Sequence, residues 1–197
     1  FRSFLWQLEP HSSAYHIPMV LRLNGSLDRA ALVLQLALGG WVTSNYAGIA
    51  CQGFPTCNTQ WWPDMDLSEG FHLTQTVGPN YLHGQLHADA RTAIHVVHRL
   101  GALLLGVVLL ALWWRYRRQS EVVGALSMVV LLYLLQAGLG VANVLLWLPL
   151  WLALLHTAGA VLLCLGLGWA WWRYRYMPER SHAVQALDGK ALYVQAR

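Results

Sequence analysis

The feature that most constrains the fold is a set of four apolar stretches, each about as long as a membrane-spanning helix. They are residues 30 to about 49, 92–114, 122–146 and 148–172. Crossing the hydrocarbon core of a bilayer takes roughly 20 helical residues. Only 11% of the residues are charged, against about 25% in an ordinary soluble domain. We therefore predict an all-α integral membrane protein built as a four-helix bundle, with the first stretch the weakest because its outer end is polar.

Basic residues flank these stretches unevenly, and they predict an orientation. They are Arg22 and Arg29 before the first stretch, Arg115, Arg117 and Arg118 after the second, and Arg173, Arg175 and Arg180 after the fourth. The 45–91 segment is acidic by contrast. Cytoplasmic loops of membrane proteins are enriched in Lys and Arg, so we expect both termini inside and segment 45–91 outside. The net charge of +4 follows from these flanks and requires no nucleic-acid partner.

The same pattern predicts three regions. Residues 1–28 are expected to form a cytoplasmic linker or tail, 29–173 the bundle with its external 45–91 loop, and 174–197 a cytoplasmic tail. The Asn24-Gly25 pair in the first region is a turn signal. Because the chain starts at Phe1 rather than Met, we also expect it to be a fragment of a longer protein.

Two of the apolar stretches carry a histidine at matching depth. His98 and His156 each lie about seven residues into their stretch, or roughly 10 Å at 1.5 Å per residue. Ionisable residues inside a membrane span are costly and usually functional, although one interhelical hydrogen bond can satisfy a neutral imidazole. The small residues that follow allow either a flat macrocycle or a helix to approach; they are Gly101, Ala102, Ala158 and Gly159. We predict that the pair holds a haem iron between two helices.

Two neighbours of His98 are candidate partners of such a cofactor. Arg99 can reach outward to lipid headgroups or pair with a haem propionate, and we favour the propionate because a guanidinium at that depth needs a partner. His95 lies one turn outward of His98 and shares part of its face. It is a candidate alternative ligand, proton relay or polar cap on the cofactor edge, or simply an interfacial histidine.

The three cysteines fall into two groups. Cys51 and Cys57 lie six residues apart in the predicted external segment, where an oxidising compartment favours a disulfide. A structural disulfide and a reversible thiol pair that passes electrons are both consistent with this spacing. Cys164 lies in the middle of the fourth stretch, and we expect it to serve packing.

Several runs of this chain together resemble the haem A synthase family. They are GGWVTSNYAG at 39–48, CQGFPTC at 51–57, QWWP at 60–63, RTAIHVVHR at 91–99 and the stretch around His156. The resemblance covers about residues 35–172 and keeps the order of the family's elements. Members are usually about twice this length, with two pseudo-repeated four-helix halves. This chain is similar to the C-terminal half.

The resemblance implies an oxidoreductase of the bacterial inner membrane that converts haem O to haem A, by oxidation of the C8 methyl group to formyl, for cytochrome oxidase biogenesis. In the family the C-terminal half is usually read as holding a haem b cofactor through a histidine pair, which carries over to His98 and His156, as the cysteine pair does to Cys51 and Cys57. The N-terminal half usually has a catalytic Glu three residues before its first histidine. Here that position is His95, so the catalytic residue is expected in the other half.

The implied partners are the lipid bilayer, haem O and haem A, with haem O synthase, an unidentified electron donor and a second copy of the chain as further candidates. Two other functions fit part of the pattern. A membrane b-type cytochrome would share His98 and His156 but would oxidise no haem. A thiol oxidoreductase would use Cys51 and Cys57, although such enzymes typically have a closer Cys-x-x-Cys and a second thiol pair.

Overall fold

The described part of the computed structural model comprises residues 19–74 and 85–195. Its helices are α1 (Met19–Ser44), η1 (Ala47–Ile49), α2 (Leu67–Gly70), α3 (Ala88–Tyr116), α4 (Ser120–Leu145) and α5 (Leu150–Gln195). Within these residues the only β-type pairing is one isolated bridge between Cys57 and Gln60. The all-α prediction is confirmed.

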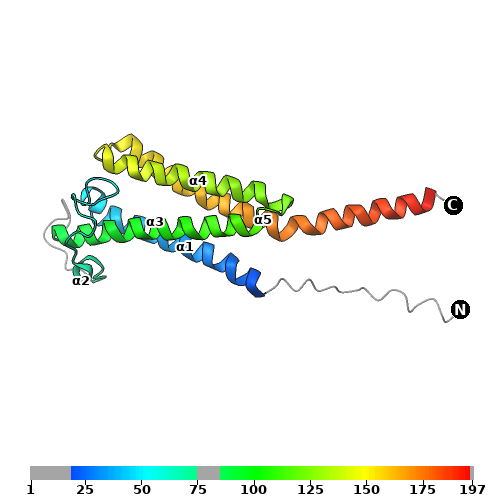
Figure 1. The fold of residues 1–197 in the computed structure, drawn as a ribbon, viewed down its shortest axis with the longest axis horizontal. Helices are drawn as coiled ribbons and strands as arrows, with labels where there is room; N and C mark the ends of the chain where they lie inside the picture. Colours follow the sequence, from blue (N-terminus) through cyan, green and yellow to red (C-terminus); the bar gives the residue numbers. More distant parts are fainter. Residues whose placement is uncertain (1–18, 75–84, 196–197) are drawn as a thin grey trace.

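Four long helices, α1, α3, α4 and α5, run alongside one another (Figure 1). Helix α1 packs mainly on α3, α4 packs mainly on α5, and contacts between α3 and α4 join the two pairs. The loop between α1 and α3 lies at the same end as the α4–α5 turn, and the α3–α4 turn lies at the opposite end (Figure 1). We call the first of these the loop end.

Three helices are long and apolar enough to cross a membrane: Ala88–Tyr116, Val122–Leu145 and Leu150–Tyr174. They coincide with the second, third and fourth predicted spans. Many of their large apolar side chains face outward, such as Leu103, Leu131 and Leu165, each about two-thirds exposed. Apolar surface of this extent suits lipid rather than water, and the chain is an integral membrane protein. The described part of α1 does not meet the same criteria, so the first span stays a prediction.

Two helices extend beyond the predicted boundaries. Helix α1 begins at Met19 and includes the Asn24-Gly25 pair, where a turn was expected. A glycine costs a helix only about 1 kcal/mol, which a helix of 26 residues can absorb. Helix α5 continues to Gln195. The sequence loses its apolar character after Trp172, which ends the predicted membrane span, but the helix itself does not end there. Residues 1–18 of the predicted linker lie outside the described residues.

The core is divided into two clusters of buried side chains. One lies near the loop end and consists of Ala47, Leu86, Ala90 and Ile94. The other lies further along the helices and includes Leu105, Leu109, Val129, Leu163 and Leu167. His98, which follows Ile94 by one helical turn, belongs to neither cluster. The level of the bundle between the two clusters is where the candidate site lies.

Candidate functional site

The two predicted ligands lie in the half of the bundle nearer the loop end. His98 is on α3 and His156 is on α5, and both side chains are half-buried. Among the described residues, α3 and α5 are not a closely packed helix pair. Each histidine therefore lies in its own closely packed helix pair, α1/α3 for His98 and α4/α5 for His156.

His98 is held from α1. The Nε2 group of Gln35 lies 3.1 Å from His98 Nδ1 and donates to the His98 carbonyl oxygen at 3.2 Å. A Cβ atom on Gly39 would lie 3.4 Å from the imidazole Cε1 and 4.0 Å from Nδ1. The Nδ1 edge of the ring thus faces α1, and Nε2 is turned away from it.

His156 is held from α4 in a similar way. The Nε2 group of Gln136 donates to the His156 carbonyl oxygen at 2.8 Å. A Cβ atom on Gly140 would lie 3.1 Å from the imidazole Cε1. The Nδ1 atom of His156 is buried and has no hydrogen-bond partner.

The two environments share a repeated sequence pattern. The first helix of each pair reads Gln-x-x-Leu-Gly, at Gln35–Gly39 and at Gln136–Gly140, and the second reads His-x-x-Gly-Ala, from His98 and from His156. Neither glutamine was among the residues predicted from the sequence. The signal that identifies them is a polar residue inside an apolar stretch, repeated at equal distance from a glycine in two helices.

Arg99 points to the loop that contains Cys51 and Cys57. Its guanidinium donates to the carbonyl oxygens of Cys51 at 2.9 Å, Gly53 at 3.0 Å and Thr56 at 3.1 Å. These bonds fasten the loop around the cysteines to α3. A guanidinium has five N–H donors, so the predicted contact with a haem propionate is compatible with these three bonds and stays a prediction.

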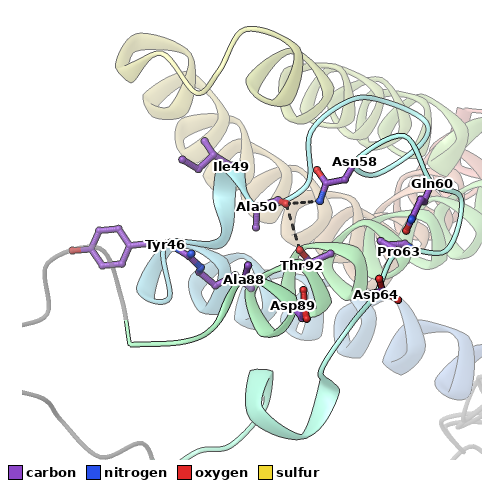
Figure 2. A pocket seen from close by; sticks show the side chains of 11 residues that line it. Tyr46, Ile49, Ala50, Asn58, Gln60, Pro63, Asp64, Ala88, Asp89 and Thr92 are labelled. Carbon is purple, nitrogen blue, oxygen red and sulfur yellow. Dashed lines mark hydrogen bonds between the residues drawn. The ribbon is translucent and has the colours of Figure 1, made fainter.

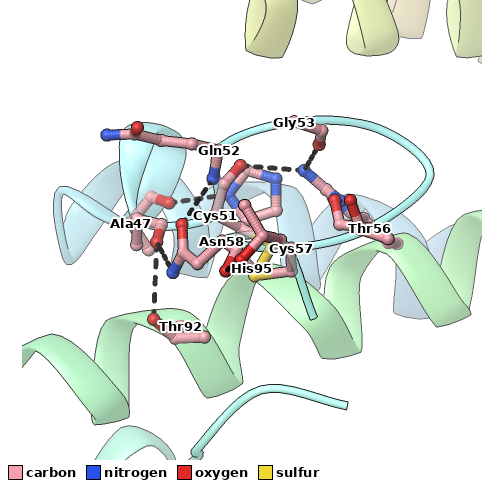
Figure 3. The surroundings of a disulfide bond; sticks show 12 residues. Ala47, Cys51, Gln52, Gly53, Thr56, Cys57, Asn58, Thr92 and His95 are labelled. Carbon is pink, nitrogen blue, oxygen red and sulfur yellow. Dashed lines mark hydrogen bonds between the residues drawn. A yellow bond between two sulfur atoms is a disulfide. The ribbon is translucent and has the colours of Figure 1, made fainter. Parts of the chain in front are cut away.

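His95 is buried beneath the same loop (Figure 3). Its Nδ1 lies 2.8 Å from the Ala47 carbonyl oxygen, so this nitrogen carries the proton and donates, because a carbonyl can only accept. The residue therefore ties η1 to α3 in this structure. Its proposed role beside a cofactor remains a prediction.

The predicted cysteine pair forms a disulfide (Figure 3). Both half-cystines are buried, with Cys51 fully enclosed and Cys57 4% exposed. Asn58 braces the loop, because it accepts from the Gln52 amide at 2.9 Å and donates to the Ala50 carbonyl at 3.1 Å. A soluble thiol would have to open this loop to reach either sulfur, which favours the structural interpretation over the redox one. Cys164 is a free cysteine packed against the larger core cluster.

A cavity of about 380 Å³ opens at the loop end (Figure 2). It lies between η1, the loop after the disulfide and the start of α3, and its lining includes Tyr46, Asn58, Asp64 and Asp89. Neither histidine of the candidate site lines it. This polar cavity lies in the segment that joins α1 to α3, and it is separate from the candidate site.

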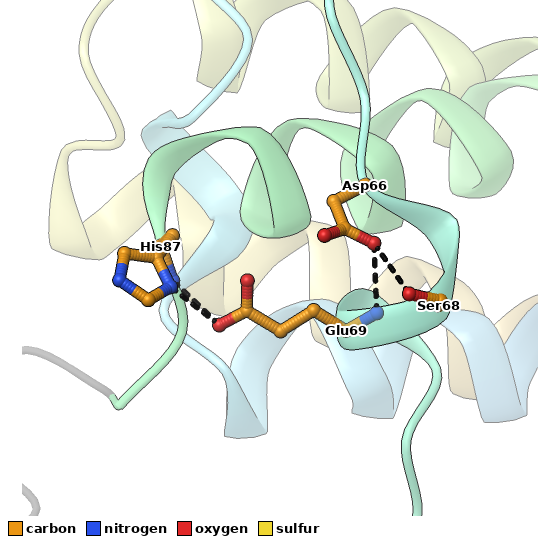
Figure 4. A network of polar contacts seen from close by, with 4 residues as sticks. All are labelled: Asp66, Ser68, Glu69 and His87. Atoms are coloured by element: carbon orange, nitrogen blue, oxygen red, sulfur yellow. Dashed lines mark hydrogen bonds and ion pairs between the residues drawn. The ribbon is translucent and has the colours of Figure 1, made fainter.

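A polar network fixes α2 beside the start of α3 (Figure 4). Asp66 accepts from the Glu69 amide and from the Ser68 hydroxyl, both at 2.9 Å. Glu69 accepts from the His87 backbone N–H at 3.1 Å and lies 2.8 Å from His87 Nδ1. The bond from the Glu69 amide lowers the pKa of Asp66, and the bonds from His87 lower the pKa of Glu69.

Within residues 19–74 and 85–195, no group of three or more His, Cys, Asp or Glu side chains could hold a metal ion. An iron porphyrin needs fewer protein ligands, because its ring nitrogens occupy the equatorial positions and the protein supplies the axial ones. His98 and His156 provide two imidazoles for that purpose. His156 Nδ1, buried without a partner, and the close approach of Gly39 and Gly140 to the two rings fit a role of these imidazoles as ligands.

Comparisons with known proteins agree with this architecture. Residues 5–167 match the model of a family described as Cytochrome oxidase assembly protein. A Heme A synthase of Shewanella oneidensis is 38% identical over 136 residues, which are 69% of this chain and 41% of that protein. A Heme A synthase of Chelativorans sp. is 34% identical over 174 residues, which are 84% of this chain and 43% of that protein.

A third relative, a Heme A synthase of Shouchella clausii, is 33% identical over 111 residues, 54% of this chain and 30% of that protein. The chain thus spans less than half the length of the curated relatives it matches. No solved structure matches the chain.

Proposed function

The chain belongs to the cytochrome oxidase assembly protein family, and from this premise we propose that it is the haem-holding half of a haem A synthase. In this proposal His98 and His156 are the axial ligands of a haem b. The observation that carries it is the pair of half-buried imidazoles on α3 and α5, which are held alike from α1 and α4.

The chain's own residues have distinct parts in this site. His98 presents Nε2 away from α1, because its Nδ1 edge faces Gln35 and Gly39. His156 presents its ring from the opposite helix pair. When bound, a haem with two histidine ligands supplies one-electron transfer, since no coordination position is left open for oxygen.

The chemistry of haem O would take place in the other half of the longer protein. Oxidation of a methyl group to a formyl group releases electrons and protons, and a carboxylate is suited to accept a proton. The position where the catalytic half of the family has Glu is His95 in this chain, and its Nδ1 is engaged by the Ala47 carbonyl. We therefore assign electron transfer, and not methyl oxidation, to this half.

The proposed setting is the bacterial inner membrane, with the loop end outside and the basic ends of the helices in the cytoplasm. The acidic loop and the arginines after the second and fourth spans support this orientation. The outward-facing leucines of α3, α4 and α5 contact lipid. A haem O molecule with its long apolar tail can then reach the protein laterally through the bilayer.

The test is a reduced-minus-oxidised visible spectrum of the purified chain in detergent, with His98→Ala and His156→Ala variants beside it. We expect a sharp low-spin b-type band in the parent chain and its loss in both variants, because each lacks one axial ligand. His72→Ala, which changes an exposed loop histidine, is the matched control and should keep the band. A bis-histidine spectrum retained in either site variant would overturn the assignment.

A second experiment separates a haem A synthase from a b-type cytochrome with the same histidines. The longer protein, supplied with haem O, should form haem A, and His98→Ala in that protein should reduce the yield. Haem binding without any conversion of haem O would favour the cytochrome.

A further inference from the structure

We propose that Gln35 and Gln136 are positioning residues, each of which orients one haem-ligating histidine by a hydrogen bond to the ring nitrogen that does not bind iron. This inference rests on the proposed haem site. It assigns a role to two half-buried glutamines whose amide oxygens are buried inside predominantly apolar helices.

The geometry around Gln35 carries the first half of the inference. Its amide reaches both the ring and the backbone of His98, at 3.1 Å and 3.2 Å, across 63 residues of sequence. Its Oε1 atom is buried with no hydrogen-bond partner. A buried amide oxygen without a hydrogen-bond partner costs free energy of folding. Its position beside the histidine therefore points to a function other than stability.

Gln136 repeats the arrangement on the other helix pair. Its Nε2 donates to the His156 carbonyl at 2.8 Å, and its Oε1 is also buried without a partner. The Nδ1 atom of the His156 ring is also buried without a hydrogen-bond partner. Two buried atoms without partners, Oε1 of Gln136 and Nδ1 of His156, therefore lie on helices that pack against each other.

The glycines show that both helix pairs make room for the amides. A Cβ atom on Gly101 would collide with Oε1 of Gln35, and one on Gly159 would collide with Oε1 of Gln136. Each of these glycines lies three residues after the histidine of its own helix. In each pair the amide oxygen thus occupies the space that a side chain at the glycine of the second helix would fill.

The buried amide oxygens can accept a hydrogen bond from the histidines when these bind iron. When the Nε2 atom of a histidine binds a metal, Nδ1 carries the proton and almost always donates it to an acceptor. Carboxamide groups have an acceptor end and a donor end, and rotation about the last side-chain bond exchanges them. Rotation of Gln35 places its oxygen at the position 3.1 Å from His98 Nδ1, and the amide then gives up its bond to the His98 carbonyl oxygen. The amide of Gln136 bonds the His156 carbonyl, and it must leave that carbonyl to present its oxygen to Nδ1 of His156.

The hydrogen bond has an electronic consequence as well as a geometric one. An imidazole that donates from Nδ1 is a stronger electron donor to iron, which stabilises the oxidised state. Removal of the acceptor should therefore raise the midpoint potential of the haem. A merely structural glutamine would affect folding or haem content but would give no ordered shift of the potential.

The experiment compares Gln35→Leu, Gln35→Glu, Gln136→Leu and Gln136→Glu by potentiometric titration and electron paramagnetic resonance of the haem-loaded chain. We expect each Leu variant to raise the midpoint potential, shift the low-spin signal and weaken haem binding about 10- to 100-fold. Each Glu variant keeps an acceptor oxygen, so its potential should equal or fall below that of the parent. Gln52→Leu, at an exposed loop position, should change neither quantity.

The outcomes separate the two proposals. A parent chain without low-spin haem overturns the haem site and this inference with it. A parent chain with haem, whose potential and resonance signal are unchanged in both Leu variants, overturns the inference alone. If a Leu variant does not fold, the Glu variant of the same residue decides, because it keeps the size of the side chain: a raised potential in it contradicts the role.

Discussion

The two helix pairs of this protein hold their histidines alike but differ in what they add at the loop end. In the α1/α3 pair, the residue after His98 is Arg99, which binds three carbonyls of the disulfide loop. In the α4/α5 pair, the residue after His156 is Thr157, an exposed side chain that bonds only to the Ala153 carbonyl of its own helix. One pair carries a cap at the loop end, formed by the described residues 45–74 and 85–87, and the other closes with a short turn at residues 146–149.

The difference separates the parts of the sequence that serve the site from those that serve the cap. Glutamine, histidine and the glycines recur in both helix pairs, so we assign them to the surroundings that the two imidazoles share. The disulfide, Arg99 and His95 occur in one pair only. The disulfide closes the loop on itself, Arg99 fastens the loop to α3, and His95 fastens η1 to α3. We infer that the cap stabilises the loop end while the repeated residues hold the imidazoles.

Replacement of Arg99 should give the largest effect on stability. Arg99→Leu leaves three loop carbonyls without their charged donor, and hydrogen bonds to charged groups contribute about 1.5–3 kcal/mol each. Because the bonds share one side chain, we expect a total loss of about 3 kcal/mol, measured by thermal unfolding in detergent. Thr157→Val at the equivalent position should have little effect, and equal losses in both variants would contradict the comparison.

Arg99→Lys sharpens the same test. A lysine ammonium is a point donor and lacks the planar fork of the guanidinium, so it should recover only part of the lost stability. Full recovery would mean that charge at this position matters more than the three-carbonyl geometry.

The glycines that face the imidazoles should give the next largest effect, and a graded one. A Cβ atom on Gly140 would lie 3.1 Å from His156 Cε1, against 3.4 Å for Gly39 and His98. Overpacking of a filled site costs about 1–3 kcal/mol, so Gly140→Ala should destabilise the fold and weaken haem binding more than Gly39→Ala. Thermal unfolding and haem titration measure the two effects.

Neighbouring glycines supply the controls for this prediction. A Cβ atom added to Gly138 or to Gly40 would meet no other atom within 4 Å, and alanine is a better helix former than glycine by about 1 kcal/mol. Gly138→Ala and Gly40→Ala should therefore be neutral or slightly stabilising. A uniform loss across all four alanine variants would show that backbone freedom, and not space beside the imidazoles, is what these glycines provide.

Much of this architecture is visible in the sequence because it depends on local composition. The second, third and fourth spans follow from apolar length, and the Cys51–Cys57 disulfide is one of the two interpretations that their spacing allows. The bonds of Gln35 and Arg99 join residues more than 40 positions apart, and no local spacing encodes such contacts. The predicted start of α1 is wrong because a turn signal at Asn24-Gly25 is weaker than the helix around it.

The smallest effect is expected at the network that holds α2. The folded-state pKa of Glu69 lies below its ordinary value of 4.5, because His87 donates to the ionised carboxylate. Its contribution to stability is thus complete above that value and is lost as the pH falls through the lowered pKa. Protease resistance of the loop should decline below about pH 4.5 in the parent, and Glu69→Gln should remove part of this pH dependence. The α4/α5 turn has no such carboxylate among its residues 146–149. If that turn loosens over the same pH range, the effect comes from the detergent or the whole fold, and the cap does not differ from the turn in this respect.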